Sequence, residues 1–177
     1  VILIGVIRDL ETAEIAVKAA QTGHMVLATL HTNDAPQTIT RLMNMGVPSY
    51  NVAAALNLVM AQRLARRLCK HCKTPLDLPR AALLREGFSE AEVDAGLTVY
   101  EAVGCDQCTE GYKGRVGIYQ VMPISDDMRK LIMHEVSDLD IAEQAAKEGI
   151  ADLVKAGLVK VREGTTSLSE IRRITKE

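Results

Sequence analysis

The chain has 177 residues, a formal net charge of −2 at pH 7 and no tryptophan. This length fits one domain, or one domain with a small added module. Apolar residues make up 47% of the sequence and aromatic residues only 3%, so we expect an aliphatic, helix-rich core. The slightly negative charge argues against a general nucleic-acid-binding protein. No apolar run approaches the length needed to span a membrane.

The first thirty residues predict a strand, a helix and a second strand. Residues 1–7 and 25–30 are short apolar runs, typical of strands buried on both faces. Residues 10–22 have helical periodicity, with Asp9 as a candidate N-cap and Gly23 at the end. A strand–helix–strand unit implies a parallel sheet with a right-handed crossover. Because the chain begins inside a predicted strand, we expect it to be part of a longer protein.

Polar residues follow both predicted strands. In open parallel sheets, ligands bind at the carboxyl ends of the strands. Arg8 and Asp9 follow the first strand, and His31 and Asp34 follow the second. This arrangement would suit a phosphate ligand and its metal. Simpler interpretations remain open, because Asp34 also fits a helix N-cap and His24 fits a helix end.

All four cysteines of the chain occur in two C-x-x-C pairs, Cys69 with Cys72 and Cys105 with Cys108. Two such pairs supply the four sulfur ligands of a tetrahedral zinc site. A redox-active dithiol or four unligated cysteines are the alternatives, but a redox pair does not explain why the motif occurs twice. A site closed by four cysteines would be structural, because it has no open coordination position.

The remaining sequence predicts mostly helices. We expect helices over residues 36–45 and 48–60, short helices over 80–85 and 89–95, a strand over 115–122, and helices over 128–135, 137–147, 150–160 and 167–175. Two helices begin with candidate capping boxes, Ser89 with Glu92 and Ser167 with Glu170. Gly157 is expected to break the helix over 150–160.

Residues 62–75 carry five cations and no acid. A nucleic-acid-binding surface would normally add interleaved aromatic residues, which this segment lacks. A solvated or subunit-facing surface is therefore the favoured interpretation. A further interpretation is electrostatic, because cations near a zinc ion with four thiolates would favour the thiolate form.

Several segments resemble the secretion-type hexameric ATPases, which are RecA-like motors of type II secretion and type IV pili. Residues 22–34 (TGHMVLATLHTND) resemble their histidine box, and residues 4–9 (IGVIRD) resemble the end of their Walker B element. Residues 111–119 and 157–170 resemble two further signatures of the family. Residues 33–46 are most similar to the motor that assembles type IV pili.

The resemblance implies an α/β fold in three parts. Residues 1–68 would form part of a RecA-like parallel sheet, residues 69–115 a zinc-binding insertion, and residues 116–177 a mainly helical subdomain. The full protein would be a cytoplasmic hexamer, peripheral to the inner membrane of a bacterium. It would bind ATP and Mg²⁺ and act on an inner-membrane platform protein, with no nucleic-acid partner.

The resemblance also implies catalytic roles for Arg8, Asp9, His24 and His31. One departure matters, because Val6 stands where the family has a glutamate that serves the metal and the attacking water. No Gly-x-x-x-x-Gly-Lys-Ser/Thr loop occurs in the sequence, so no cofactor-binding Walker A residue is assigned. We therefore predict that this chain alone neither binds ATP well nor hydrolyses it. A type II secretion ATPase and a stand-alone zinc-ribbon interaction module are the alternatives.

Overall fold

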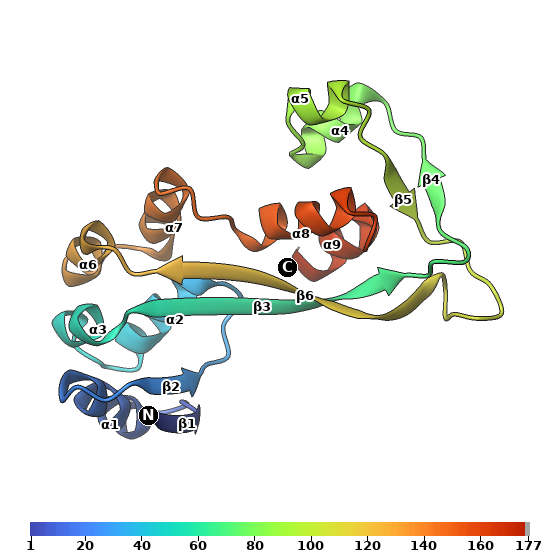
Figure 1. The fold of residues 1–177 in the computed structure, drawn as a ribbon. Coiled ribbons are helices and arrows are strands. Elements are labelled where there is room, and N and C mark those ends of the chain that lie inside the picture. Colours follow the sequence, from blue (N-terminus) through green and yellow to red (C-terminus); the bar gives the residue numbers. More distant parts are fainter. Residues whose placement is uncertain (176–177) are drawn as a thin grey trace. The chain divides into compact units, whose positions relative to one another are not determined.

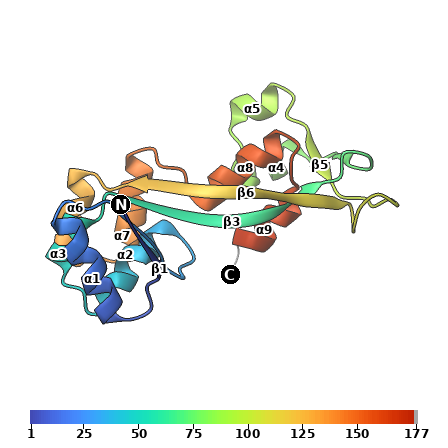
Figure 2. The ribbon, with the colours of Figure 1, turned by 60° about the horizontal axis from the view of Figure 1, so that its bottom comes forward.

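The computed structural model describes residues 1–175, which form two compact units. Unit 1 comprises residues 1–61 and 120–151, and unit 2 comprises residues 62–119 and the segment from Asp152 onward. The chain passes between the units three times, within strand β3 (Leu58–Leu68), within strand β6 (Tyr112–Pro123) and between Ala151 and Asp152. These strands pair with each other and run side by side in Figures 1 and 2. The fold is mixed α/β, with small two-stranded sheets, one of them parallel and one antiparallel.

Unit 1 begins with the predicted strand–helix–strand unit. Strand β1 (Ile2–Val6) and strand β2 (Val26–Thr29) pair in parallel, and α1 (Leu10–Gln21) connects them. Asp9 caps α1, because its side chain accepts a hydrogen bond from the Thr12 N–H at 2.8 Å. The parallel sheet and the N-cap expected from the sequence are therefore confirmed.

The prediction that both strands are buried on both faces is wrong in this structure. The side chain of Leu3 is 80% exposed and that of Leu27 is 52% exposed. A two-stranded sheet with one crossover helix covers only part of its surface. The continuous apolar sequence of β1 and β2 is thus left largely open to solvent.

The remaining helices of unit 1 form its core. They are α2 (Ala35–Asn44), α3 (Ser49–Ala55), α6 (Asp126–Met133) and α7 (Asp138–Lys147). Helix α3 packs against α6, and α2 packs against α7. Fully buried side chains of this unit include Ile39, Val52, Met128, Ile132 and Ile141 from these helices and Met122 from β6.

The predicted helix over residues 48–60 is too long. It ends at Ala55, and β3 begins at Leu58. Exposure alternates at this point, because Leu58 is 49% exposed, Val59 is 6% and Met60 is 55%. This period of two is typical of a half-buried strand, and pairing with β6 outweighs the helical interpretation.

Unit 2 contains the remaining short elements. They are β4 (Thr74–Leu76), α4 (Arg80–Glu86), α5 (Glu90–Asp94), β5 (Val99–Glu101), α8 (Leu153–Arg162) and α9 (Leu168–Thr175). Strands β4 and β5 pair in antiparallel fashion. The two short helices and the capping box of Ser89 with Glu92 are confirmed.

Helix α8 corrects the expectation for Gly157. The helix runs without a break through this residue. A Cβ atom on Gly157 would lie 2.9 Å from two side-chain carbons of Ile171 in α9. The glycine therefore allows close packing of two helices instead of ending one of them.

The C-terminal sixty residues divide between the units, because α6 and α7 belong to unit 1 and α8 and α9 to unit 2. The three-part division at residues 68/69 and 115/116 stays a prediction.

Candidate functional site

The carboxyl edge of the β1–β2 sheet carries the first group of candidate residues. The Ile7 N–H donates to the Thr29 carbonyl oxygen at 2.9 Å, so the two strands leave the sheet together. Arg8 and His31 follow at this same edge. Asp9 already serves as the cap of α1, and the hydrogen bonds from Thr12 that make this cap lower the pKa of its carboxyl group.

His24 lies elsewhere in unit 1. It precedes β2, at the amino end of the strand, where its Nδ1 atom is 3.2 Å from the Thr22 hydroxyl oxygen. Six residues of largely extended chain lie between it and His31, a span of roughly 20 Å. The structure therefore does not bring His24 to the edge that carries Arg8 and His31.

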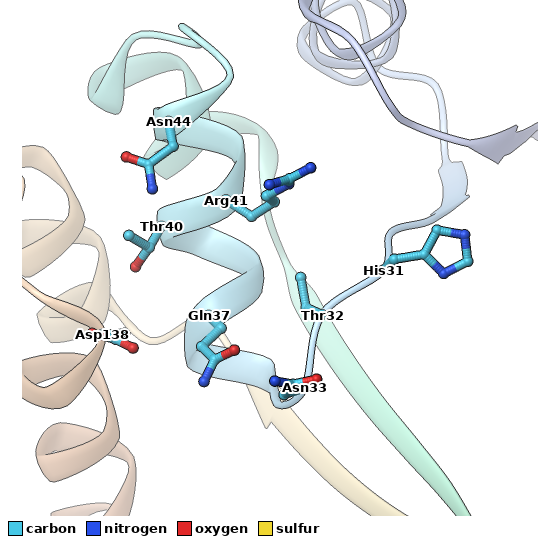
Figure 3. Close-up of a pocket in the computed structure, with 8 residues that line it drawn as sticks. All are labelled: His31, Thr32, Asn33, Gln37, Thr40, Arg41, Asn44 and Asp138. Carbon is cyan, nitrogen blue, oxygen red and sulfur yellow. The ribbon is translucent and has the colours of Figure 1, made fainter. Parts of the chain in front are cut away.

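An open pocket of about 350 Å³ lies beside α2, and its lining is polar. The residues that line it are His31, Thr32, Asn33, Gln37, Thr40, Arg41, Asn44 and Asp138. Figure 3 shows Gln37, Thr40 and Asn44 on the side of α2 that faces Asp138, whereas Arg41 extends toward the side of Thr32 and His31. The hydroxyl oxygen of Thr40 is buried and has no hydrogen-bond partner among residues 1–175.

Sequence reasoning identified His31 but missed the other side of this pocket. A signal was present, because Gln37, Thr40, Arg41 and Asn44 follow the i, i+3, i+4, i+7 spacing of one helix face. Asp138 had no such signal, because it enters the pocket through the packing of α7 on α2.

The amino end of α2 is satisfied from within the chain. The Asp34 carboxylate accepts from the Gln37 N–H at 2.9 Å, and the buried Gln120 side chain accepts from the Ala35 N–H at 3.0 Å. These two N–H groups are therefore not available to a phosphate.

The four cysteines of unit 2 form the second candidate site. Their sulfur atoms all lie within 4.8 Å of one another. The individual separations are 3.9 Å for Cys69–Cys105, 3.7 Å for Cys72–Cys108 and 3.5 Å for Cys105–Cys108. Four sulfurs around zinc at about 2.3 Å would be separated by roughly 3.8 Å. The cluster is thus close to the tetrahedron that a bound metal ion requires, and these four residues could hold one.

The pKa values of the two thiols of the second pair are shifted in opposite directions. For Cys108, burial acts to raise the pKa, but hydrogen bonds from Cys105 and Cys72 outweigh it and lower the pKa to about 7. For Cys105, the Gln107 N–H acts to lower the pKa, but burial and the neighbouring sulfurs raise it to about 12. Of these two thiols, Cys108 therefore loses its proton more easily.

The chain around the second cysteine pair is tightly constrained. Gly111 has a φ angle of +81°, and a Cβ atom there would lie 2.7 Å from the Ala102 side chain and 2.8 Å from the Val103 nitrogen. Only glycine fits this turn. From here the Gly111 carbonyl accepts from the Cys69 N–H at 2.8 Å, which ties the two cysteine pairs together.

Beside the cysteines lies a buried charge, the carboxylate of Glu170. The Ser167 hydroxyl caps the Glu170 N–H as predicted, at 3.2 Å. The Glu170 carboxylate, however, accepts hydrogen bonds from the guanidinium groups of Arg66 and Arg173. Burial acts to raise the pKa of Glu170, but the hydrogen bonds from Arg173 and Arg66 outweigh it and lower the pKa to about 2.

Within residues 1–175, no helix is both long and apolar enough to cross a membrane.

Comparison with known proteins places these features in a family. Residues 1–173 match the family described as type II/IV secretion system protein. The chain is 56% identical over 177 residues to the type IV pilus assembly ATPase PilB of Pseudomonas aeruginosa, which covers 100% of this chain and 31% of PilB. It is 42% identical over 178 residues to the type II secretion system protein HxcR of the same organism, covering 100% of this chain and 34% of HxcR. The chain therefore spans about a third of the length of these relatives.

A solved structure shares the fold. The ATPase DotB of Legionella pneumophila matches with a TM-score of 0.63 at 18% identity, covering 97% of this chain and 37% of DotB. With the family match over almost all of its length, the chain belongs to the type II/IV secretion system protein family.

Proposed function

We propose that this chain is the histidine-box and metal-binding part of an ATPase that powers type IV pilus assembly. The observation that carries the proposal is the identity of 56% to a pilus assembly ATPase, against 42% to a type II secretion protein, each over the whole chain. The second candidate, a type II secretion ATPase, is supported by the shared family. A stand-alone zinc-ribbon module is disfavoured, because the match includes unit 1.

In this proposal, β1, α1 and β2 are part of a larger RecA-like parallel sheet. The exposed apolar side chains of Leu3 and Leu27 support this, because such residues normally lie against further strands or helices. The complete protein would be a ring of six subunits that binds ATP and Mg²⁺ and drives an inner-membrane platform protein from the cytoplasmic side.

The catalytic proposal centres on the edge that holds Arg8 and His31. Both side chains are suited to the phosphates of ATP, and Asp9 would hold α1 in place through its cap. His24 lies at the other end of β2, so we propose that it acts on a different part of the site. Val6 offers neither a base nor a ligand, so this site lacks a carboxylate that phosphoryl transfer uses to orient its nucleophile.

A segment exchange tests the function. Residues 1–177 would replace the matching segment of PilB in P. aeruginosa, once with Val6 and once with the Val6→Glu substitution. The same two versions would replace the matching segment of HxcR. We expect the Val6→Glu chimera of PilB to restore pilus extension and the Val6 chimera to fail, with little rescue in HxcR. Rescue of HxcR secretion but not of pilus extension would favour the second candidate.

The isolated chain offers a simpler test of the missing phosphate loop. We expect no ATP turnover above buffer for the purified chain, and none for its Val6→Glu variant. Measurable turnover by either form would overturn the prediction that the chain is inactive by itself.

We also propose that the cysteine cluster binds structural zinc. The near-tetrahedral sulfur spacing supports this, and four protein ligands leave no position for a substrate. Gently purified protein should contain about one zinc per chain. A zinc content near zero together with a reversible disulfide would instead support the redox alternative.

A further inference from the structure

We infer that the turn between α8 and α9 positions the metal site, so that metal binding and the order of α9 are coupled in both directions. This segment, here called the Glu170 turn, comprises residues 164–167 between the helices and residues 168–170 at the start of α9. The inference rests on the proposed zinc site, but it concerns residues that are not ligands. It assigns to Glu170 and its neighbours the role of holding both cysteine pairs in one geometry.

The first cysteine pair is held to the Glu170 turn from both of its sides. On the amino side, the Leu68 N–H donates to the Thr165 carbonyl oxygen at 2.9 Å. On the carboxyl side, the Lys73 ammonium group donates to the Gly164 carbonyl oxygen at 2.7 Å. The backbone that carries Cys69 and Cys72 is thus fixed against the turn immediately before and after the two ligands.

The second cysteine pair is held through Tyr112, four residues after Cys108. The Tyr112 hydroxyl oxygen lies 2.7 Å from that of Ser167, in a buried contact with the same turn. The preceding residue, Gly111, accepts the hydrogen bond from the Cys69 N–H. Both ligand pairs therefore converge on one short segment that contributes no ligand itself.

Glu170 is the centre of this arrangement. Its fully buried carboxylate accepts from the Arg66 backbone N–H at 2.8 Å and from the Arg66 guanidinium at 2.9 and 3.0 Å. Arg173 donates to it at 2.6 and 2.9 Å. The Arg66 guanidinium also lies over the Tyr112 ring, 4.1 Å from its centre, and the Arg66 carbonyl accepts from the Thr166 hydroxyl at 2.8 Å.

These contacts give the coupling a physical basis. Arg66 lies three residues before Cys69, and Tyr112 touches both Arg66 and the Glu170 turn, so movement of the turn moves both ligand pairs. Groups behind the ligands of a metal site orient those ligands, and their loss typically weakens metal binding by about 10–100-fold. Linkage then requires the reciprocal effect, in which metal binding orders the turn by the same factor.

Glu170→Gln is the direct test, and Glu163→Gln is its matched control. Glu163 lies just before the turn, and its carboxylate forms an exposed ion pair with Lys160. Zinc affinity of the 177-residue chain would be measured by competition with a chromophoric chelator. We expect Glu170→Gln to weaken zinc binding by about 10-fold or more, and Glu163→Gln to stay within about twofold of the wild type. Equal affinities of the two variants would overturn the inference.

Two further measurements separate coupling from general loss of structure. Cobalt(II) should give the same thiolate absorption in wild type and Glu170→Gln, because the four ligands are unchanged. Hydrogen exchange at residues 165–175 should accelerate when zinc is removed, whereas exchange in α7 of unit 1 should not change. Exchange at residues 165–175 that does not respond to zinc would also overturn the inference.

If Glu170→Gln does not fold, Tyr112→Phe removes only the hydroxyl contact to Ser167 and should weaken zinc binding by a smaller factor, about 2–10-fold. An affinity equal to that of the wild type would then count against the inference. Failure of the wild-type chain to bind any zinc would instead reject the proposed metal site. The two failures are therefore distinguishable.

Discussion

The two candidate sites differ in how much of their chemistry this chain supplies. In unit 2, all four candidate ligands come from one chain, their sulfurs are near tetrahedral spacing, and buried contacts hold them from behind. In unit 1, Arg8 and His31 follow two strands at one edge of a largely exposed sheet, and His31 also lines an open polar pocket. A structural site can be completed by local packing, whereas the proposed phosphate site needs groups that this sequence does not contain.

The largest effect is expected when one of the four cysteine ligands of unit 2 is removed. Cys108→Ser removes one of four ligands, and the free energy of zinc binding in such sites is largely folding free energy, on the order of 10 kcal/mol. We expect loss of tightly bound zinc and faster hydrogen exchange over residues 69–115, with α1 to α3 of unit 1 unaffected.

His71→Ala is the matched control for this variant. His71 lies between the first two cysteines and is exposed. It should keep one zinc per chain, as measured by metal analysis. Loss of zinc from His71→Ala but not from Cys108→Ser would mean that the ligand set contains the histidine instead.

A second prediction concerns the charge behind the cysteines. The pKa of Glu170 falls from an ordinary value of 4.5 to about 2 in the folded chain. A carboxyl group with a lowered pKa stabilises the fold fully above pH 4.5, and this contribution is lost as the pH falls toward 2. Its size is roughly 3 kcal/mol.

Measured on the metal-free chain, the stability difference between wild type and Glu170→Gln reports this contribution without the change in zinc affinity that the variant is also expected to cause. By chemical denaturation, the difference should be constant from pH 7 to pH 5 and should shrink as the pH falls below 4.5. A difference that does not change with pH would mean that the pairing of Glu170 with Arg66 and Arg173 adds no net stability.

The features that the sequence predicted correctly depend on short-range chemistry. Asp9, Asp34 and Ser89 cap the helices that follow them, as expected, because a cap requires only its next three residues. The spacing of two C-x-x-C pairs likewise predicted the cluster, since each pair must turn both sulfurs toward one point.

The features that the sequence did not predict depend on partners far along the chain. Residues 58–60 became a strand because β6, more than fifty residues later, pairs with them. Gly157 is required by Ile171 in another helix, and Glu170 is held by Arg66, 104 residues away. The capping-box pattern at Ser167 and Glu170 did not indicate that the Glu170 carboxylate would instead accept hydrogen bonds from this distant arginine.

The smallest effect is expected for a substitution in the open pocket of unit 1. The Thr40 hydroxyl is buried beside the unit 1 pocket, with no partner among residues 1–175. An unsatisfied buried hydroxyl destabilises the fold, so Thr40→Val, which keeps the side-chain shape, should leave the free energy of unfolding unchanged or raise it by up to about 1 kcal/mol. Thr38→Val is the control, because the Thr38 hydroxyl bonds to Thr32 at 2.8 Å and its loss should destabilise. If Thr40→Val destabilises as much as the control does, then a bound water or ligand satisfies this hydroxyl in solution. The hydrogen bonds of the unit 1 pocket would then be complete, as are those behind the cysteine cluster of unit 2.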